Sequence, residues 1–178
     1  MQAGRSVATT MAFTALEGLP MGTRCGAIDP GVLPLLLEQE KLSVQALTDL
    51  LYEHSGLLGI SGISSDMRDL LASPCAEAAE AVEYFCYRIA RELGSLAAAL
   101  GGLDGLVFTG GIGEHAAPVR ARICSLSRWL GIAIDTAANA ENRTVLHSVD
   151  SAVQVLVIPT NEERMIARHV AQVLAMDD

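Results

Sequence analysis

Two short apolar runs, each followed by a turn and a helical pattern, constrain the fold of this 178-residue chain most strongly. Residues 106–109 and 153–158 have the length and the β-branched content of buried strands. A helix is expected after each strand, over residues 118–130 and 161–176. Repeated strand–turn–helix units are typical of proteins in which helices cover a mostly parallel sheet. The predicted fold class is therefore α/β.

The first half of the chain is expected to be mainly helical. Asp29 and Pro30 predict the start of one helix, and Ser43 caps a second helix that ends at Gly56. The longest helix opens at Ser73-Pro74 and runs to Leu100, where two glycines stop it.

Glycine-rich segments are expected to be irregular. Residues 4–26 are predicted to form loops and strand fragments, residues 57–65 a connector, and residues 110–113 a tight turn. Residues 132–134 are predicted to be a further strand, and Thr160 with Glu163 a capping box for the last helix.

Composition excludes several classes of protein. Hydrophobic residues make up 51% of the chain, which is too much for a disordered protein. The formal net charge of −9 comes with no basic run, so nucleic acid is not an expected partner. No apolar run is long enough to span a membrane, and the four cysteines form no metal-binding pair. A cytoplasmic protein with reduced thiols is predicted.

The strongest local signal is the run Thr-Gly-Gly-Ile-Gly-Glu-His over residues 109–115. Glycines between a strand and a helix let a ligand approach the backbone amides closely. The carboxylate of Glu114 would repel a phosphate, so this loop suits the sugar and base of a nucleotide better than its terminal phosphates. A tight turn without a ligand is the alternative.

The same loop also fits a dinucleotide-binding fingerprint. Gly111, Gly113 and Ala116 have the required spacing, and Asp135 follows at the end of the next predicted strand. An NAD-binding oxidoreductase is therefore a competing interpretation. The long helical stretch before the loop and the small number of strands after it weigh against this interpretation.

Three further residues could carry chemistry. Arg24 lies between two glycines, where a guanidinium could clamp a carboxylate or a phosphoryl group. Arg68 lies at a helix start beside Asp66, and Glu162 follows a buried strand, where one carboxylate suits Mg²⁺. The alternatives are a solvated arginine, an ordinary helix cap and acids that complement a helix dipole.

Several ungapped motifs, all in the same order, resemble the acetate kinase family. The run Val-Phe-Thr-Gly-Gly-Ile-Gly-Glu over residues 107–114 is the longest, and the likeness extends over nearly the whole chain from about Gly4. The other matching segments are residues 13–18, 21–24, 28–30, 55–59, 66–68 and 157–163.

The resemblance implies a ribonuclease-H-like domain of the superfamily that contains acetate and sugar kinases, Hsc70 and actin. It implies reversible, ATP-dependent phosphorylation of acetate or another short-chain carboxylate with Mg²⁺, giving acetyl phosphate and ADP, by a homodimer. Arg24 would stabilise the transferring phosphoryl group, and Glu162 would help to hold Mg²⁺. The nucleotide site would be lined by Asp66, Met67, Arg68, Gly111, Ile112, Gly113, Glu114 and His115.

The chain also departs from the family pattern. Ala8 stands where the family has an aspartate, and His115 stands where it has an asparagine. The motifs of the N-terminal half of the family do not occur, so residues 1–178 are expected to be the C-terminal nucleotide-binding domain, incomplete at its N-terminus, with negligible turnover alone. A non-catalytic nucleotide-binding or dimerisation module is the alternative, and the choice among acetate, propionate and butyrate stays open.

Overall fold

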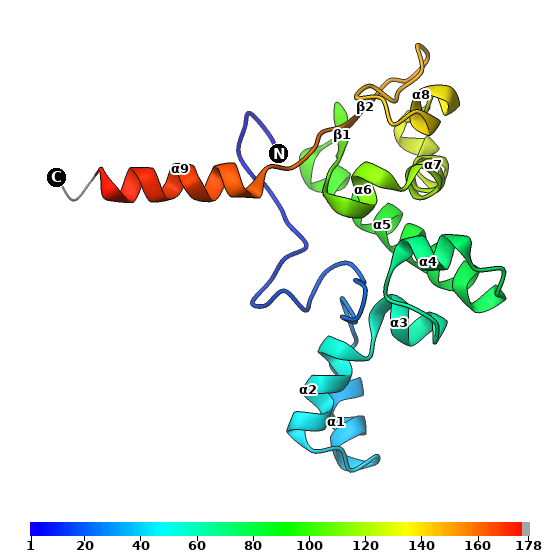
Figure 1. Cartoon of the computed structure of the whole chain (residues 1–178), viewed down its shortest axis with the longest axis vertical. Helices are drawn as coiled ribbons and strands as arrows, with labels where there is room; N and C mark the ends of the chain where they lie inside the picture. The colour runs from blue at the N-terminus through cyan, green and yellow to red at the C-terminus, as the bar shows by residue number, and fades with distance from the viewer. Residues whose placement is uncertain (176–178) are drawn as a thin grey trace.

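The computed structural model describes residues 1–175, and Figure 1 shows the path of the chain. Helices pack around a small sheet, so the α/β class is confirmed. The elements follow in the order α1 (Val32–Glu38), α2 (Val44–Glu53), α3 (Gly56–Ser61), α4 (Met67–Ala72), α5 (Ala76–Leu100), β1 (Gly105–Phe108), α6 (Gly110–His115), α7 (Ala117–Leu126), the 3-10 helix η1 (Arg128–Leu130), α8 (Thr136–Ala140), β2 (Gln154–Val157) and α9 (Glu162–Leu174).

The two predicted strands pair with each other in parallel. Their register runs from Gly105 opposite Gln154 to Phe108 opposite Val157. Phe108, Val155 and Val157 are buried, so one face of this ribbon contributes to the core. Because parallel strands end at the same edge, the segments that follow β1 and β2 lie next to each other.

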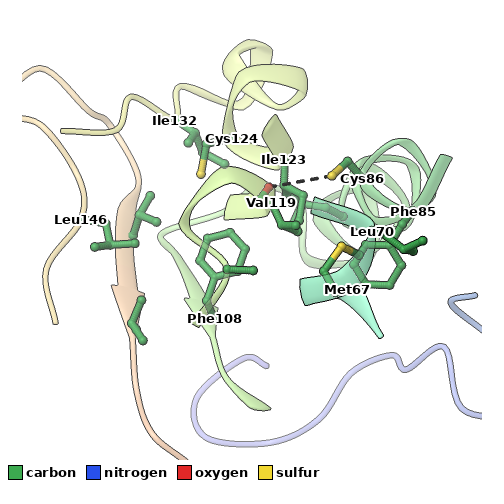
Figure 2. Close-up of a cluster of buried hydrophobic side chains, with 14 of the residues drawn as sticks. Met67, Leu70, Phe85, Cys86, Phe108, Val119, Ile123, Cys124, Ile132 and Leu146 are labelled. Carbon is green, nitrogen blue, oxygen red and sulfur yellow. Dashed lines mark hydrogen bonds between the residues drawn. The ribbon is translucent and has the colours of Figure 1, made fainter. Parts of the chain in front are cut away.

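Helix α5 is the centre of the packing. It contacts α3, α4 and α7, and Gly101 ends it in the left-handed conformation, with φ of 74°, as predicted. Its buried alanines, Ala78 and Ala81, let neighbouring helices approach closely. Figure 2 shows side chains of several elements meeting in one core, among them Met67, Leu70, Phe85, Cys86, Phe108, Val119 and Ile123.

The segment predicted as a connector after Gly56 is partly helical instead. Gly56 does not end α2, which stops at Glu53, but begins α3 with a positive φ of 59°. The amides of Leu57 and Leu58 donate to the carbonyls of Met21 and Gly22. Partners more than thirty residues away therefore stabilise α3, and local glycine content gives no indication of them.

Other short elements also differ from the prediction. Residues 110–113 belong to helix α6 rather than to a tight turn. Residues 132–134 do not form the predicted strand, and only Ile134 among them makes an isolated bridge, with His147. Asp135 caps the short α8, whose amides at Ala137 and Ala138 donate to its carboxylate. The helix predicted over residues 118–130 breaks at Ser127 into α7 and η1.

The two ends of the described chain are mostly exposed. Residues 1–31 contain no helix and only one isolated bridge, Gln2 with Arg5. Asn161, rather than Thr160, caps α9 and accepts from the amide of Arg164. The predicted capping box of Thr160 with Glu163 is therefore wrong. Figure 1 shows α9 projecting away from the other helices, and the Met176 end of the predicted helix lies outside the described residues.

Two further findings concern the exposure of the cysteines and the apolarity of the helices. Cys86 and Cys124 are buried, and burial raises the pKa of each thiol to about 11. Cys75 is exposed and occupies the N-cap position of α5 without a side-chain hydrogen bond. Within residues 1–175 no helix has the length and apolarity needed to cross a membrane.

We predict that Gly56→Ala destabilises the protein much more than Gly62→Ala. Both glycines have a positive φ, 59° and 63°, but a Cβ at Gly56 would lie 2.2 Å from the carbonyl oxygen of Met21, whereas a Cβ at Gly62 would meet nothing within 4 Å. Strain alone should cost Gly62→Ala about 1 kcal/mol, and the added backbone clash should raise the cost at Gly56 to about 3 kcal/mol or more.

Urea unfolding of both variants and of the wild type would measure the two free energies. Equal costs at the two positions would show that the contact between α3 and residues 21–24 is not formed in solution.

Candidate functional site

A cavity of about 520 Å³ lies between α4 and α6. This volume falls within the range of small-molecule sites, which span roughly 300–1,000 Å³. The walls come from two segments at least forty residues apart in the sequence. The lining residues are Ser65, Asp66, Met67, Arg68, Leu71, Gly111, Ile112, His115, Ala116 and Pro118.

Asp66 and Arg68 form the charged edge of this cavity. The Asp66 carboxylate caps α4 by accepting from the amide of Arg68 at 2.8 Å, and it also accepts from the Arg68 guanidinium, with Nη2 at 2.5 Å. These bonds from Arg68 lower the pKa of Asp66 to about 2. The side chain of Arg68 is 88% exposed, so the ionised pair can exchange water for an anionic ligand.

The opposite wall is formed by α6. Gly110 enters the helix with a positive φ of 73°, and a Cβ built on Gly111 would meet no atom within 4 Å. The backbone at Gly111 is therefore open to a ligand. Ile112 and His115, on the same helix, supply an apolar and a polar side chain to the cavity.

Gly113 and Glu114 lie outside the lining, although they belong to the same glycine-rich run. Gly113 packs on β1, since a Cβ there would lie 3.4 Å from the carbonyl carbon of Phe108. The Glu114 carboxylate accepts from the amides of Gly110 and Thr160, at 2.9 and 3.0 Å, and from the Thr160 hydroxyl. These hydrogen bonds lower the pKa of Glu114, and the bond from the Thr160 amide has the largest effect. Glu114 thus ties α6 to the segment that follows β2.

Arg24 also lies outside the residues that line the cavity. Its guanidinium carbon is 5.7 Å from the centre of the Tyr52 ring, and its Nη1 lies 3.5 Å from the carbonyl oxygen of Ala15. The loop that carries it does reach the cavity edge, because a Cβ on Gly22 would lie 3.0 Å from the carbonyl of Ser65. The roles that the resemblance implies for Arg24 and for the α6 backbone require a cleft shared by both, which stays a prediction.

Glu162 is exposed in the first turn of α9. Residues 1–175 contain no cluster of three or more acidic, histidine or cysteine side chains that could hold a metal. Mg²⁺ needs few protein ligands, because it keeps several waters and binds substrate phosphates. The exposed carboxylate of Glu162, two residues after Thr160, which is bonded to α6 through Glu114, fits that chemistry.

The dinucleotide interpretation has less support from the geometry. Asp135 does not follow a strand, and its carboxylate is engaged by two amides of its own helix. A larger hollow of about 610 Å³ lies beside β1, but Asp104 is its only charged side chain among the described residues. Neither feature offers the groups that a nicotinamide nucleotide requires.

Four lining residues were not assigned to the site by the sequence analysis: Ser65 and Ala116, which adjoin assigned residues, and Leu71 and Pro118. Leu71 lies four residues after Met67, so the helical spacing places both on one face of α4. Pro118 lies in the first turn of α7, directly after the loop. Leu71 could have been found from the helical repeat, whereas the place of Pro118 depends on how α7 packs.

Comparison with known proteins shows the family of this chain. The family model of the Acetokinase family matches residues 1–168. The chain belongs to the acetokinase family. Acetate kinases of Rhodopseudomonas palustris (strain TIE-1) and Methylocella silvestris are 60% and 54% identical to it, over 93% and 96% of this chain. The chain spans only 42% of the length of either relative.

Solved structures of the acetokinase family share this fold. The crystal structure of Porphyromonas gingivalis acetate kinase superposes with a TM-score of 0.85 at 41% identity, covering 93% of this chain and 43% of that one. A propionate kinase from Francisella tularensis gives a TM-score of 0.84 at 42% identity, covering 89% of this chain and 41% of that one.

We predict that Glu114 stabilises the protein in a pH-dependent way. A carboxyl group whose pKa is lowered by folding stabilises the native state above its unfolded pKa of about 4.3, and this contribution is lost as the pH falls through the lower folded value. Glu114→Gln should therefore lower the urea midpoint at pH 7, and the gap to the wild type should shrink below about pH 4. A gap of constant size from pH 7 to pH 3 would contradict the role of the charge.

Proposed function

We propose that this chain provides the nucleotide-binding part of an enzyme that phosphorylates acetate with ATP, reversibly, to give acetyl phosphate and ADP. One observation carries the proposal: Asp66, Met67 and Arg68 line the same cavity as Gly111, Ile112 and His115. Family membership supports the reaction class. The motifs that the sequence assigns to adenine nucleotide are thus neighbours in the fold.

The cavity is suited to adenosine. Met67, Leu71 and Ile112 offer apolar surface for a base, and the open backbone at Gly111 permits close approach. Arg68 can attract a phosphate or bond to a ribose, because its guanidinium is exposed and, within residues 1–175, pairs with Asp66 alone. Glu114 is directed away from the ligand into its bonds with Gly110 and Thr160, so it does not oppose an anion at the cavity.

Phosphoryl transfer requires charge to be placed around the reacting group from several sides. We infer that Arg24 stabilises the transferring phosphoryl group and that Glu162 holds Mg²⁺ through bound water. When bound, Mg²⁺ would neutralise charge on the phosphates. Both residues belong to segments that contact the cavity region, Arg24 through Gly22 beside Ser65 and Glu162 through Thr160.

The remaining assignments are part of the same proposal. Residues 1–178 would form the C-terminal nucleotide-binding domain, of the ribonuclease-H-like type, in a cytoplasmic homodimer. The carboxylate substrate, acetate or propionate as in the names of the relatives, would be bound mainly by residues outside this chain. A non-catalytic nucleotide-binding module is the second candidate, favoured by Ala8, which stands where the family pattern has an aspartate.

We predict that the chain binds Mg-ADP and that Arg68→Met weakens this binding about tenfold, because a charge-assisted bond to the ligand is lost. Arg143→Met is a matched control, since Arg143 is also exposed and also pairs with an acid two residues before it, Glu141, but lies away from the cavity. Isothermal titration calorimetry would measure the affinity of both variants for Mg-ADP. Equal affinities of the two variants would refute the assigned cavity.

Gly111→Ala tests the same cavity from its other wall. The new methyl group meets no protein atom within 4 Å, so folding should be unaffected while a ligand against the backbone is obstructed. Unchanged Mg-ADP affinity together with unchanged thermal stability would show that no ligand approaches this part of α6.

We predict that these 178 residues alone form acetyl phosphate from ATP and acetate at least about a thousandfold more slowly than a full-length relative, since one side of the phosphoryl clamp is not supplied. A hydroxamate assay with the R. palustris acetate kinase as positive control would measure the rates. Turnover comparable to the control would overturn the proposed division of labour.

A further inference from the structure

Arg120 is a buried arginine that the proposed reaction does not use. It belongs to α7, its relative exposure is 0%, and it is the largest fully buried side chain of the described structure. Burying a guanidinium costs free energy unless its charge and its donors are satisfied. Within residues 1–175 no carboxylate forms an ion pair with it, so its partners must be of another kind.

All five hydrogen bonds of Arg120 go to neutral oxygens. Nε and Nη2 donate to the side-chain and backbone oxygens of Asn139, at 2.8 and 3.0 Å, and Nη2 also donates to Oδ1 of Asn142 at 2.6 Å. Nη1 donates to the carbonyl oxygens of Gly113 and Glu114, at 2.9 and 3.0 Å. A guanidinium has five N–H donors, and these contacts use its complete capacity.

The carbonyls that Arg120 contacts lie at the ends of two short helices. Gly113 and Glu114 belong to the last turn of α6, and Asn139 belongs to the last turn of α8. The last carbonyls of a helix have no partner within the helix and carry its negative end. One buried cation therefore caps α6 and α8 together, and the carbonyl oxygens offset its charge. Asn139 also donates to the carbonyl of Ala117, which fixes the acceptor in turn.

Helix α6 needs such support. It has six residues, and helices this short are not stable without tertiary contacts. Its first amide, at Gly110, is held by the Glu114 carboxylate, and its last carbonyls are held by Arg120. The residues that face the cavity, Gly111, Ile112 and His115, lie on this same helix.

We propose that Arg120 is a positioning residue for nucleotide binding: through the carbonyls of Gly113 and Glu114 it holds α6 in the orientation that presents Gly111, Ile112 and His115 to the cavity. The inference rests on the proposed function, because it assigns that cavity to adenine nucleotide. Arg120 itself does not line the cavity and would not touch the ligand. Lysine cannot replace it, since one ammonium group lacks the planar fork that reaches four residues at once.

Two variants and a control separate positioning from general stability. Arg120→Lys keeps the charge and removes the fork. Asn142→Gly removes a single acceptor and keeps the positive φ of 52° at that exposed position, so it should fold even if Arg120→Lys does not. Arg122→Lys, on the same helix, alters an exposed arginine that pairs with Glu83 and serves as the control.

Three measurements on the full chain are needed: urea stability, hydrogen exchange of the amides of residues 114–116 without nucleotide, and the Kd for Mg-ADP. We expect Arg120→Lys to speed exchange at these amides about tenfold more than in α5 and to raise Kd about tenfold. For Asn142→Gly we expect about threefold changes in the same direction, and for Arg122→Lys changes within about twofold.

The inference would be overturned if Arg120→Lys and Asn142→Gly both bound Mg-ADP with the Kd of the wild type. So would an exchange increase spread evenly over α5 and α6, because that result would indicate a merely structural arginine. If the wild-type chain fails to bind Mg-ADP, the proposed function is refuted, and the exchange data without nucleotide still decide whether Arg120 fixes α6.

Discussion

The parallel pairing of β1 with β2 is the contact on which the arrangement of the site depends. It brings the start of α6 and the segment before α9 to the same edge of the ribbon, although about fifty residues of sequence separate them. Glu114 then joins the two segments by accepting from Gly110 and Thr160. Because α5 packs on α4 and α7, it places the Asp66 end of α4 opposite α6, and the cavity is the space between these helices.

Patterns that act within one element were readable from the sequence, and patterns that depend on distant partners were not. The apolar stripe and the glycine stop of α5, the Ser43 cap of α2 and both strands are local features, and the structure has them. Helix α3 depends on bonds to residues 21 and 22, and α6 depends on Glu114 and Arg120 at its two ends. Glycine content in these two segments indicated a connector and a tight turn, because it carries no information about such partners.

The candidate site divides in a similar way. The motif residues on α4, together with Gly111, Ile112 and His115, line one cavity, whereas Gly113 and Glu114 have structural contacts instead. Consecutive residues of one motif can thus serve different purposes, and only the packing on Phe108 and the bonds to Thr160 distinguish them. Arg24 and Glu162 lie on segments beside the cavity rather than in its wall, so the sequence identifies them as candidates without fixing their geometry.

Opposite charges hold the two ends of α6, which explains why no carboxylate within residues 1–175 pairs with Arg120. Glu114 is the acid closest to Arg120 in the sequence. Its carboxylate accepts from Gly110 at the amino end of the helix, where a negative charge is favourable. A guanidinium at the carboxyl end is favourable for the same reason, and neutral carbonyls satisfy it without competing for that acid. If Arg120 paired with Glu114 instead, Gly110 and Thr160 would lose their acceptor, and the link between α6 and the segment that follows β2 would weaken. Because the two charges lie at opposite ends of the helix, the bonds of Glu114 and those of Arg120 can form together. The cavity wall at Gly111 is therefore held at both ends of α6.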